Sequence, residues 1–182
     1  MIIVLGALSA FGPFSLDKYL PSLPEMAKSM HTTASLTQLS LTSCLIGLAV
    51  GQLLAGPISD VRGRRMPLMI GMVVYGVSSL LCAFSPSIEL LILLRFIQGI
   101  AGSAGIVISR AIVRDMYSGS ELTKFLSMLM LVNGAAPILS PILGGQLLQV
   151  TSWRGVFIVL TAIGVAMLLA VDLAAGKRLA GI

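Results

Sequence analysis

Long runs without a charged side chain restrict what this chain can form more than any other feature. No Asp, Glu, Lys or Arg occurs in 29–59, and similar runs cover 66–88, 125–153 and 155–171. A helix needs about 20 mostly apolar residues to cross a lipid bilayer. The whole chain is only 10% charged, whereas soluble domains carry about 25% charged residues. We therefore expect an all-α integral membrane protein, which excludes a soluble enzyme, a secreted domain and a disordered tail.

The apolar runs predict six transmembrane helices that form a single bundle over residues 1–182. The first helix is expected to continue to about Ala27 despite its three prolines, and the last helix is expected to be short. Two three-helix repeats are expected, at about 1–86 and 87–182. The predicted spans are approximately 1–27, 35–59, 66–88, 88–113, 125–153 and 155–171.

The basic residues predict the orientation, because Lys and Arg concentrate in the short cytoplasmic loops of membrane proteins. At most three of them, Lys18, Lys28 and Arg154, lie in links on one side. The rest, apart from an arginine inside the fourth span, lie on the other side, which predicts that both termini are cytoplasmic. This distribution accounts for the net charge of +5 without a nucleic-acid partner. The residues on the predicted cytoplasmic side are Arg62, Arg64, Arg65, Arg110, Arg114, Lys124, Lys177 and Arg178.

Metal, cofactor and nucleophile signals are absent from the sequence. His31 is the single histidine, which argues against a zinc site and a histidine-based triad. Cys44 and Cys82 lie in apolar runs, where small buried residues are expected. We therefore predict no metal, no cofactor and no enzymatic activity.

The end of the second span and the link to the third carry two glycines, an acid and two bases: Gly56, Asp60, Gly63, Arg64 and Arg65. A solvated cytoplasmic loop would also be basic, so charge alone leaves two interpretations open. The spacing of these residues resembles the signature loop between helices two and three of the major facilitator superfamily. The resemblance implies that the five residues form a cytoplasmic gate.

Arg95 lies inside the fourth span. An arginine at membrane depth costs at least about 2.5 kcal/mol, so it either faces a cavity or partner or extends to the interface. Position alone does not separate these alternatives. Arg95, Gln98 and Gly99 resemble the helix-four motif of the same superfamily, and this resemblance links Arg95 to proton transfer.

The fifth span contains Gly134, Pro137, Pro141, Gly144 and Gly145. Prolines alone would indicate a kinked helix, but a kink does not require the paired glycines. The pattern resembles the helix-five motif of the antiporters in the superfamily. It departs from that motif in having alanine before the first proline and in having a second proline.

Asp17 ends the charge-free run of the first span and is followed by Lys18. Adjacent helical residues point about 100° apart, so Lys18 is a poor partner for Asp17. The segment 17–24 resembles the aspartate–x–tyrosine–leucine–proline–x–leucine–proline run of the Bcr/CflA (bicyclomycin-resistance) antiporters. This is the most subfamily-specific resemblance in the chain. The alternative is an interfacial Asp17 that is always ionised.

The resemblance covers essentially all 182 residues and corresponds to the N-terminal half of a fold built from two six-helix halves. It implies that a C-terminal half is missing, and that the whole protein exports drugs in exchange for protons across a bacterial inner membrane. Asp17 would carry the proton and Arg95 would couple it, while Tyr19, Gln98 and Asn133 would line the substrate cavity. The implied partners are a small drug, protons, the bilayer and the second half. Three alternatives remain: a sugar or metabolite porter, an intramembrane enzyme, and a membrane subunit without transport of its own.

Overall fold

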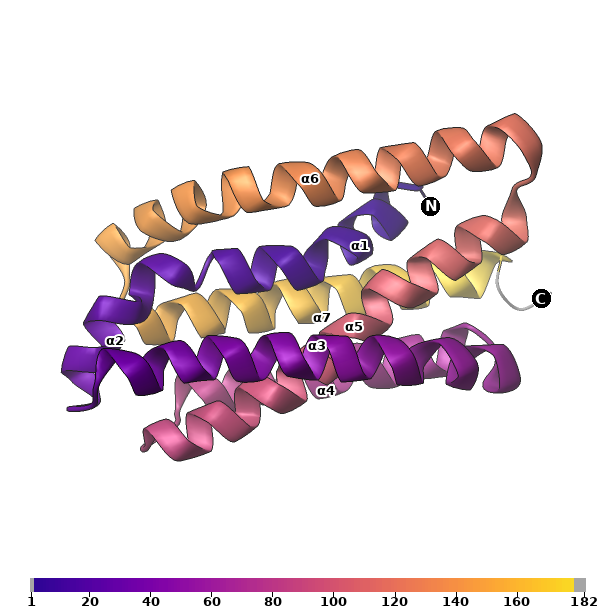
Figure 1. Cartoon of the computed structure of the whole chain (residues 1–182). Helices are drawn as coiled ribbons and strands as arrows, with labels where there is room; N and C mark the ends of the chain where they lie inside the picture. Colours follow the sequence, from indigo (N-terminus) through magenta and orange to yellow (C-terminus); the bar gives the residue numbers. More distant parts are fainter. Residues whose placement is uncertain (1, 179–182) are drawn as a thin grey trace.

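The computed structural model describes residues 2–178, and all regular structure in this part of the chain is helical (Figure 1). Most of the helices are long and roughly aligned, and together they form one bundle. They are α1 (Ile2–Asp17), the 3-10 helix η1 (Leu20–Ser22), α2 (Leu23–Ser29), α3 (Ala34–Arg62), α4 (Arg65–Ala83), α5 (Ile88–Met116), α6 (Gly119–Val150) and α7 (Trp153–Arg178).

Among the described residues, α3 to α7 are long and apolar enough to cross a membrane. This agrees with the predicted membrane protein and with its second to sixth spans. The last helix is not short, however, because it continues through Asp172 to Arg178. A terminal turn outside the apolar region can hold a charged residue, and Asp172 has an ionic partner there.

The prediction of one continuous first helix to Ala27 is wrong. α1 has 16 residues and ends at Asp17, and η1 and α2 follow after a turn. Pro21 and Pro24 explain the interruption, since neither has a backbone N–H to donate to the carbonyl group four residues earlier. Pro13, by contrast, lies inside α1 without ending it.

Side-chain caps mark the starts of α3 and α5, and one glycine forms the turn between α3 and α4. Thr33 and Ser87 accept hydrogen bonds from backbone N–H groups in the first turns of α3 and α5. Gly63 joins α3 to α4 with φ of 80°, a conformation in which glycine avoids the strain of a side chain.

α5 forms the centre of the bundle and packs closely against α3. A Cβ atom at Gly47 of α3 would overlap the carbonyl oxygen of Phe96, and one at Gly99 of α5 would overlap that of Cys44. Small residues at such positions allow helices to approach closely in a membrane, where packing stabilises their association. The α3–α5 contact is therefore close, and it supports the residues that α5 places in the core.

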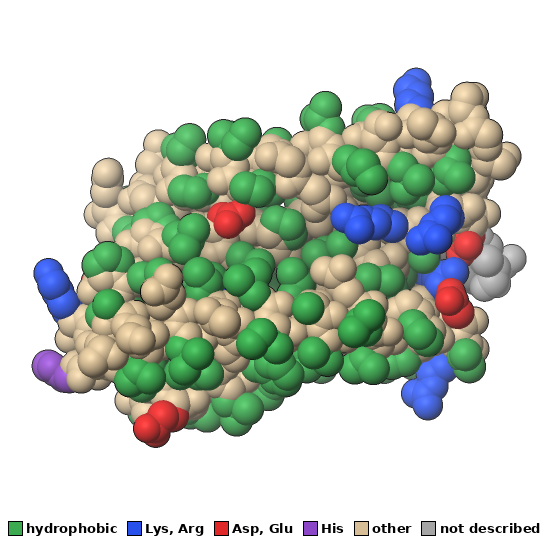
Figure 2. All heavy atoms as spheres, in the orientation of Figure 1, with side chains coloured by type: hydrophobic (Ala, Val, Ile, Leu, Met, Phe, Trp, Pro, Cys, Tyr) green, Lys and Arg blue, Asp and Glu red, His purple; other side chains and the backbone are tan. Residues whose placement is uncertain are grey.

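α6 lies along one edge of the bundle beside α1 (Figure 1). It buries a single narrow face, at Leu129, Ala136, Ser140 and Gly144. The remaining surface of α6 is mostly apolar, and the molecule as a whole exposes many hydrophobic side chains (Figure 2). Such a surface suits contact with lipid or with further apolar helices.

Candidate functional site

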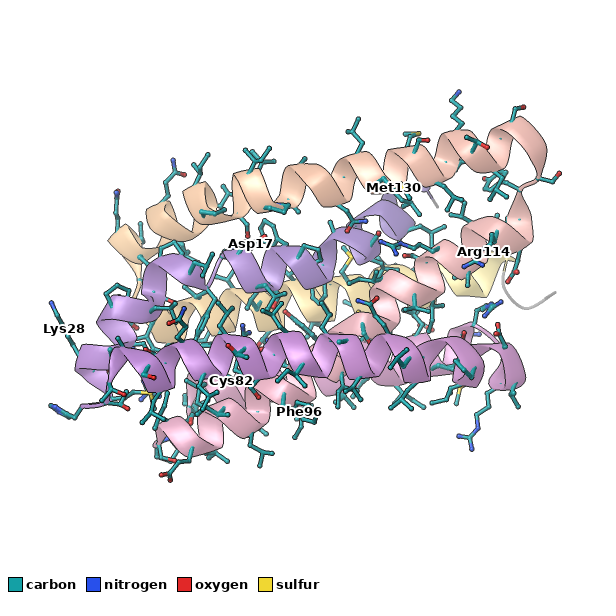
Figure 3. All side chains as sticks on the ribbon, in the orientation of Figure 1. Asp17, Lys28, Cys82, Phe96, Arg114 and Met130 are labelled. Atoms are coloured by element: carbon teal, nitrogen blue, oxygen red, sulfur yellow. The ribbon has the colours of Figure 1, made fainter. Side chains whose placement is uncertain are left out.

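Asp17 is the last residue of α1 and is half-buried. Figure 2 shows an acidic side chain isolated among apolar ones on the face that carries α1 and α6, where Figure 3 labels Asp17. Within the described part of the chain, Asp17 has no ion pair or side-chain hydrogen bond. Lys18 is buried with its Nζ 5.0 Å from the Phe14 ring centroid, so it leaves Asp17 unpaired.

Arg95 is completely buried in the bundle, so it does not extend to the membrane interface. One of its terminal nitrogens donates a hydrogen bond of 2.6 Å to Gln98 Oε1, and Gln98 Nε2 donates one of 2.6 Å to Ser79 Oγ of α4. The guanidinium lies 4.4 Å from the ring centroid of Tyr19 and 5.6 Å from that of Phe157. Its Nε and other terminal nitrogen have no hydrogen-bond partner. Aromatic faces therefore provide much of the stabilisation of this buried charge.

Tyr19 connects this cluster to the break after α1. Its hydroxyl donates to Met26 Sδ at 2.8 Å and lies 2.8 Å from Ser40 Oγ. Its ring packs against Phe157 of α7, with 5.5 Å between centroids. Tyr19 follows Asp17 by two residues in the chain, and its ring packs against the Arg95 guanidinium. It therefore connects the two residues that we predict to couple protons. Asp17 and Arg95 themselves form no ion pair.

The three residues predicted to line a substrate cavity lie in different surroundings. Tyr19 and Gln98 are buried in the bundle core. Asn133 of α6 is half-buried, and its Nδ2 donates to Ser9 Oγ at 2.5 Å and to the Leu129 carbonyl at 2.9 Å. The structure does not bring the three together around one open cavity. Their contact with a substrate stays a prediction.

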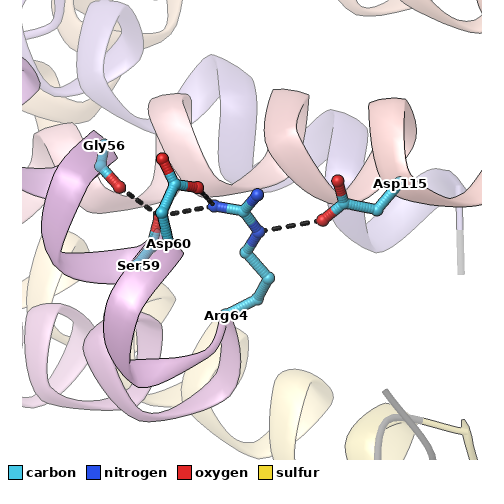
Figure 4. Close-up of polar contacts among 5 residues, drawn as sticks. All are labelled: Gly56, Ser59, Asp60, Arg64 and Asp115. Atoms are coloured by element: carbon cyan, nitrogen blue, oxygen red, sulfur yellow. Dashed lines mark hydrogen bonds and ion pairs between the residues drawn. The ribbon is translucent and has the colours of Figure 1, made fainter.

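Asp60 and Arg64 of the predicted gate form a charged cluster with Asp115 at the end of α3 (Figure 4). Arg64 donates through Nε to Asp115 Oδ2 at 2.9 Å, and through a terminal nitrogen to Ser59 Oγ at 2.8 Å and to Asp60 Oδ1. The hydrogen bond to Asp115 contributes most to raising the pKa of Arg64 above its ordinary value; partial burial opposes it, and Asp60 adds to the rise. The cluster ties α3, the turn and α5 together.

A second ion pair joins Arg65 to Asp172 of α7, with 2.9 Å between nitrogen and oxygen. Sequence reasoning did not assign Asp115 or Asp172 to the gate, although both are acids near helix ends. Nothing in their local sequence identifies Arg64 and Arg65 as their partners. Gly56 contributes its carbonyl oxygen, which accepts the Ser59 hydroxyl at 2.8 Å.

The helix-five motif faces α1 only in part. Ser140 Oγ donates to the Phe14 carbonyl at 2.7 Å, and a Cβ atom at Gly144 would lie 2.5 Å from the Lys18 carbonyl oxygen. Gly134 and Gly145 have open space where a side chain would be. Pro137 and Pro141 lie within α6 without ending it. In the described residues, no group of three or more His, Cys, Asp or Glu could hold a metal ion.

A family comparison decides the assignment. The family model described as Major Facilitator Superfamily matches residues 3–178. The chain belongs to the major facilitator superfamily. This membership and the five long apolar helices confirm a multi-pass membrane protein.

Relatives within the superfamily agree with the predicted branch. The chain is 50% identical over 172 residues to the "Uncharacterized MFS-type transporter YdgK" of Bacillus subtilis, covering 93% of this chain and 43% of the relative. It is 37% identical over 163 residues to the "Bicyclomycin resistance protein homolog" of Haemophilus influenzae, covering 90% and 41%. It is 37% identical over 161 residues to the "Chloramphenicol resistance protein" of Pseudomonas aeruginosa, covering 86% and 38%. These names support the resemblance to the Bcr/CflA antiporters, and their bacterial sources agree with an inner-membrane location. The chain thus spans about two fifths of the length of these relatives.

Proposed function

We propose that the chain is the N-terminal six-helix half of a drug:proton antiporter that works by alternating access. In this proposal α1 counts as the first membrane helix together with α3 to α7, and both termini are cytoplasmic. Two three-helix repeats, about 1–86 and 87–182, would make up the half, and a second six-helix half would complete the transporter. Family membership and the resistance-protein names of the relatives support this assignment.

The isolated carboxyl group of Asp17 is the observation that carries the proposal. Ionisable residues within membrane segments are expensive, and they mark ion and proton pathways when they face a cavity or an interface. Asp17 lies on an open apolar face and has no ionic partner among the described residues. It is therefore our candidate for the group that takes up and releases protons.

Arg95 would transmit the protonation state of Asp17 through Tyr19. The Tyr19 ring, which packs against the guanidinium, belongs to the segment that begins immediately after Asp17. A shift of this segment would move the ring relative to Arg95 and its bonded Gln98. Coupling in this form needs no direct contact between the carboxylate and the guanidinium.

The cluster of Asp60, Arg64 and Asp115 would act as the cytoplasmic gate together with Gly63 and Arg65. Three elements meet at Arg64, so rearrangement of this one side chain would loosen the contacts among them. Gly144 would keep α6 against α1 while the two halves rock. Drugs would enter a mostly apolar cavity with few polar contacts, among them Asn133.

Transport is tested with a chimera in which this chain replaces the matching segment of the Bacillus subtilis relative. Everted membrane vesicles are first made acidic inside. A drug that the antiporter carries into the vesicle in exchange for protons then dissipates this proton gradient. We expect chloramphenicol or another lipophilic drug to do so. Gradient loss with sugars or metabolites but not with drugs would favour the alternative porter. No response to either class from a correctly inserted chimera would contradict the proposal and favour a chain without transport.

A further inference from the structure

Two arginines outside the gate line an open cavity between α5 and α6. The cavity has a volume of about 330 Å³ and is lined by Arg110, Arg114, Leu126, Leu129 and Met130. Figure 2 shows basic side chains gathered where these two helices approach their connection, and Figure 3 labels Arg114 and Met130 at this end of the molecule. The cavity thus has a basic side from α5 and an apolar side from α6.

Neither arginine is neutralised within the described part of the chain. The ion pairs found there belong to Arg64 and Arg65. Asp115 adjoins Arg114 in sequence, but its carboxylate is bound by Arg64. Arg110 and Arg114 are one helical turn apart, a spacing at which like charges repel each other.

Arg110 is also placed unlike an ordinary loop arginine. It is half-buried and lies within α5, well before the helix ends at Met116. The excess of bases in cytoplasmic loops therefore does not by itself account for its position. A half-buried charged group that faces apolar side chains is costly unless an opposite charge lies near it.

We propose that Arg110 and Arg114 bind the carboxylate or phosphate group of an amphiphilic anion whose apolar tail lies against α6. Guanidinium groups present paired N–H donors that match carboxylate and phosphate oxygens. Leu129 is buried and Met130 is 67% exposed. Leu129 therefore offers a fixed apolar contact for the tail, and the flexible Met130 side chain offers an adaptable one. Amphiphilic cations would be repelled by the same pair.

This binding goes beyond the proposed transport and is measured without flux, so failure of one does not imply failure of the other. The anion has two possible sources, an anionic membrane lipid or a soluble amphiphile. Native mass spectrometry of the purified chain in neutral detergent counts bound molecules directly. The probes are dodecyl phosphate, dodecyltrimethylammonium, inorganic phosphate, phosphatidylglycerol and phosphatidylcholine.

We expect one dodecyl phosphate to bind, and the double variant Arg110→Gln, Arg114→Gln to weaken its binding at least about tenfold. Lys124→Gln removes an exposed charge from the same end of α6 and should change binding less than about twofold. Replacing both arginines by lysine keeps the charge but removes the paired N–H donors, so this variant should bind more weakly than the parent and more tightly than the glutamine variant, which separates loss of the site from misfolding. Phosphatidylglycerol that binds in competition with dodecyl phosphate identifies a lipid source. If it does not compete, the source is a soluble amphiphile.

Three results would overturn the proposal. One is unchanged dodecyl phosphate binding in a folded double glutamine variant. Another is equally tight binding of dodecyltrimethylammonium, which would remove the role of charge. The third is equally tight binding of inorganic phosphate, which would remove the role of the apolar wall.

Discussion

At the scale of single residues, Tyr19 determines how a positive charge is held in the core. Its ring covers the Arg95 guanidinium, while its hydroxyl contacts Ser40 and Met26. Tyr19→Phe keeps the ring, and Ser40 retains its bond to the Thr37 carbonyl. We expect a loss of about 1 kcal/mol in unfolding free energy, the usual value of one hydrogen bond.

Tyr19→Leu removes the ring as well and should cost about 2 kcal/mol more, because a desolvated cation–π contact is lost. Thermal unfolding of both variants in detergent measures the difference. Equal melting temperatures for the phenylalanine and leucine variants would show that the ring does not stabilise Arg95.

Sequence reasoning identified Arg95 but not its surroundings. An arginine within an apolar run signals a special position, yet the run does not say which way the side chain points. Tyr19 and Phe157, the two rings around it, are distant from it in sequence, and their positions follow from how α1 and α7 pack. The isolation of Asp17 likewise depends on three-dimensional placement, since Lys18 is adjacent in sequence but contacts Phe14 instead.

At the scale of elements, close contact between α1 and α6 rests on the absence of a side chain at Gly144. A Cβ atom there would lie 2.5 Å from the Lys18 carbonyl oxygen, whereas the next residue, Gly145, has open space. Gly144→Ala should therefore destabilise the protein by about 1–3 kcal/mol through overpacking.

Gly145→Ala is the matched control and should be neutral or stabilising by up to about 1 kcal/mol, because alanine favours helix more than glycine does. Melting temperatures of the two variants, measured side by side, test the contact. Similar stability of both would contradict close packing at Gly144.

The helices themselves were largely predictable. Charge-free runs predict α3, α4, α6 and α7, and a run interrupted by Arg95 predicts α5, because a membrane helix needs about 20 mostly apolar residues. The break after Asp17 is the one feature of this segment that we predict wrongly, although Asp17 and Lys18 end the charge-free run and Pro21 and Pro24 follow it. The sequence predicts that the last helix ends at Asp172, because a charge there follows an apolar run, but pairing of Asp172 with Arg65 allows α7 to continue.

At the scale of the whole molecule, the proposed orientation places the α2–α3 link outside and the α5–α6 link in the cytoplasm. The native cysteines, Cys44 and Cys82, are buried, so an introduced cysteine can be labelled selectively. A membrane-impermeant maleimide should label Lys28→Cys in intact cells, and Lys124→Cys only after the cells are permeabilised. Labelling of both positions from outside would contradict an orientation with cytoplasmic termini.

Drug-induced loss of a proton gradient tests whether Asp17 carries the exchanged proton. The measurement compares the chimera with its Asp17→Asn and Glu25→Gln variants in everted vesicles. Glu25 is an exposed acid in the neighbouring α2 and serves as the matched control. We predict that Asp17→Asn abolishes the drug response, while Glu25→Gln retains it at the level of the parent chimera. A full drug response from a stably inserted Asp17→Asn protein would show that the proton travels by another group.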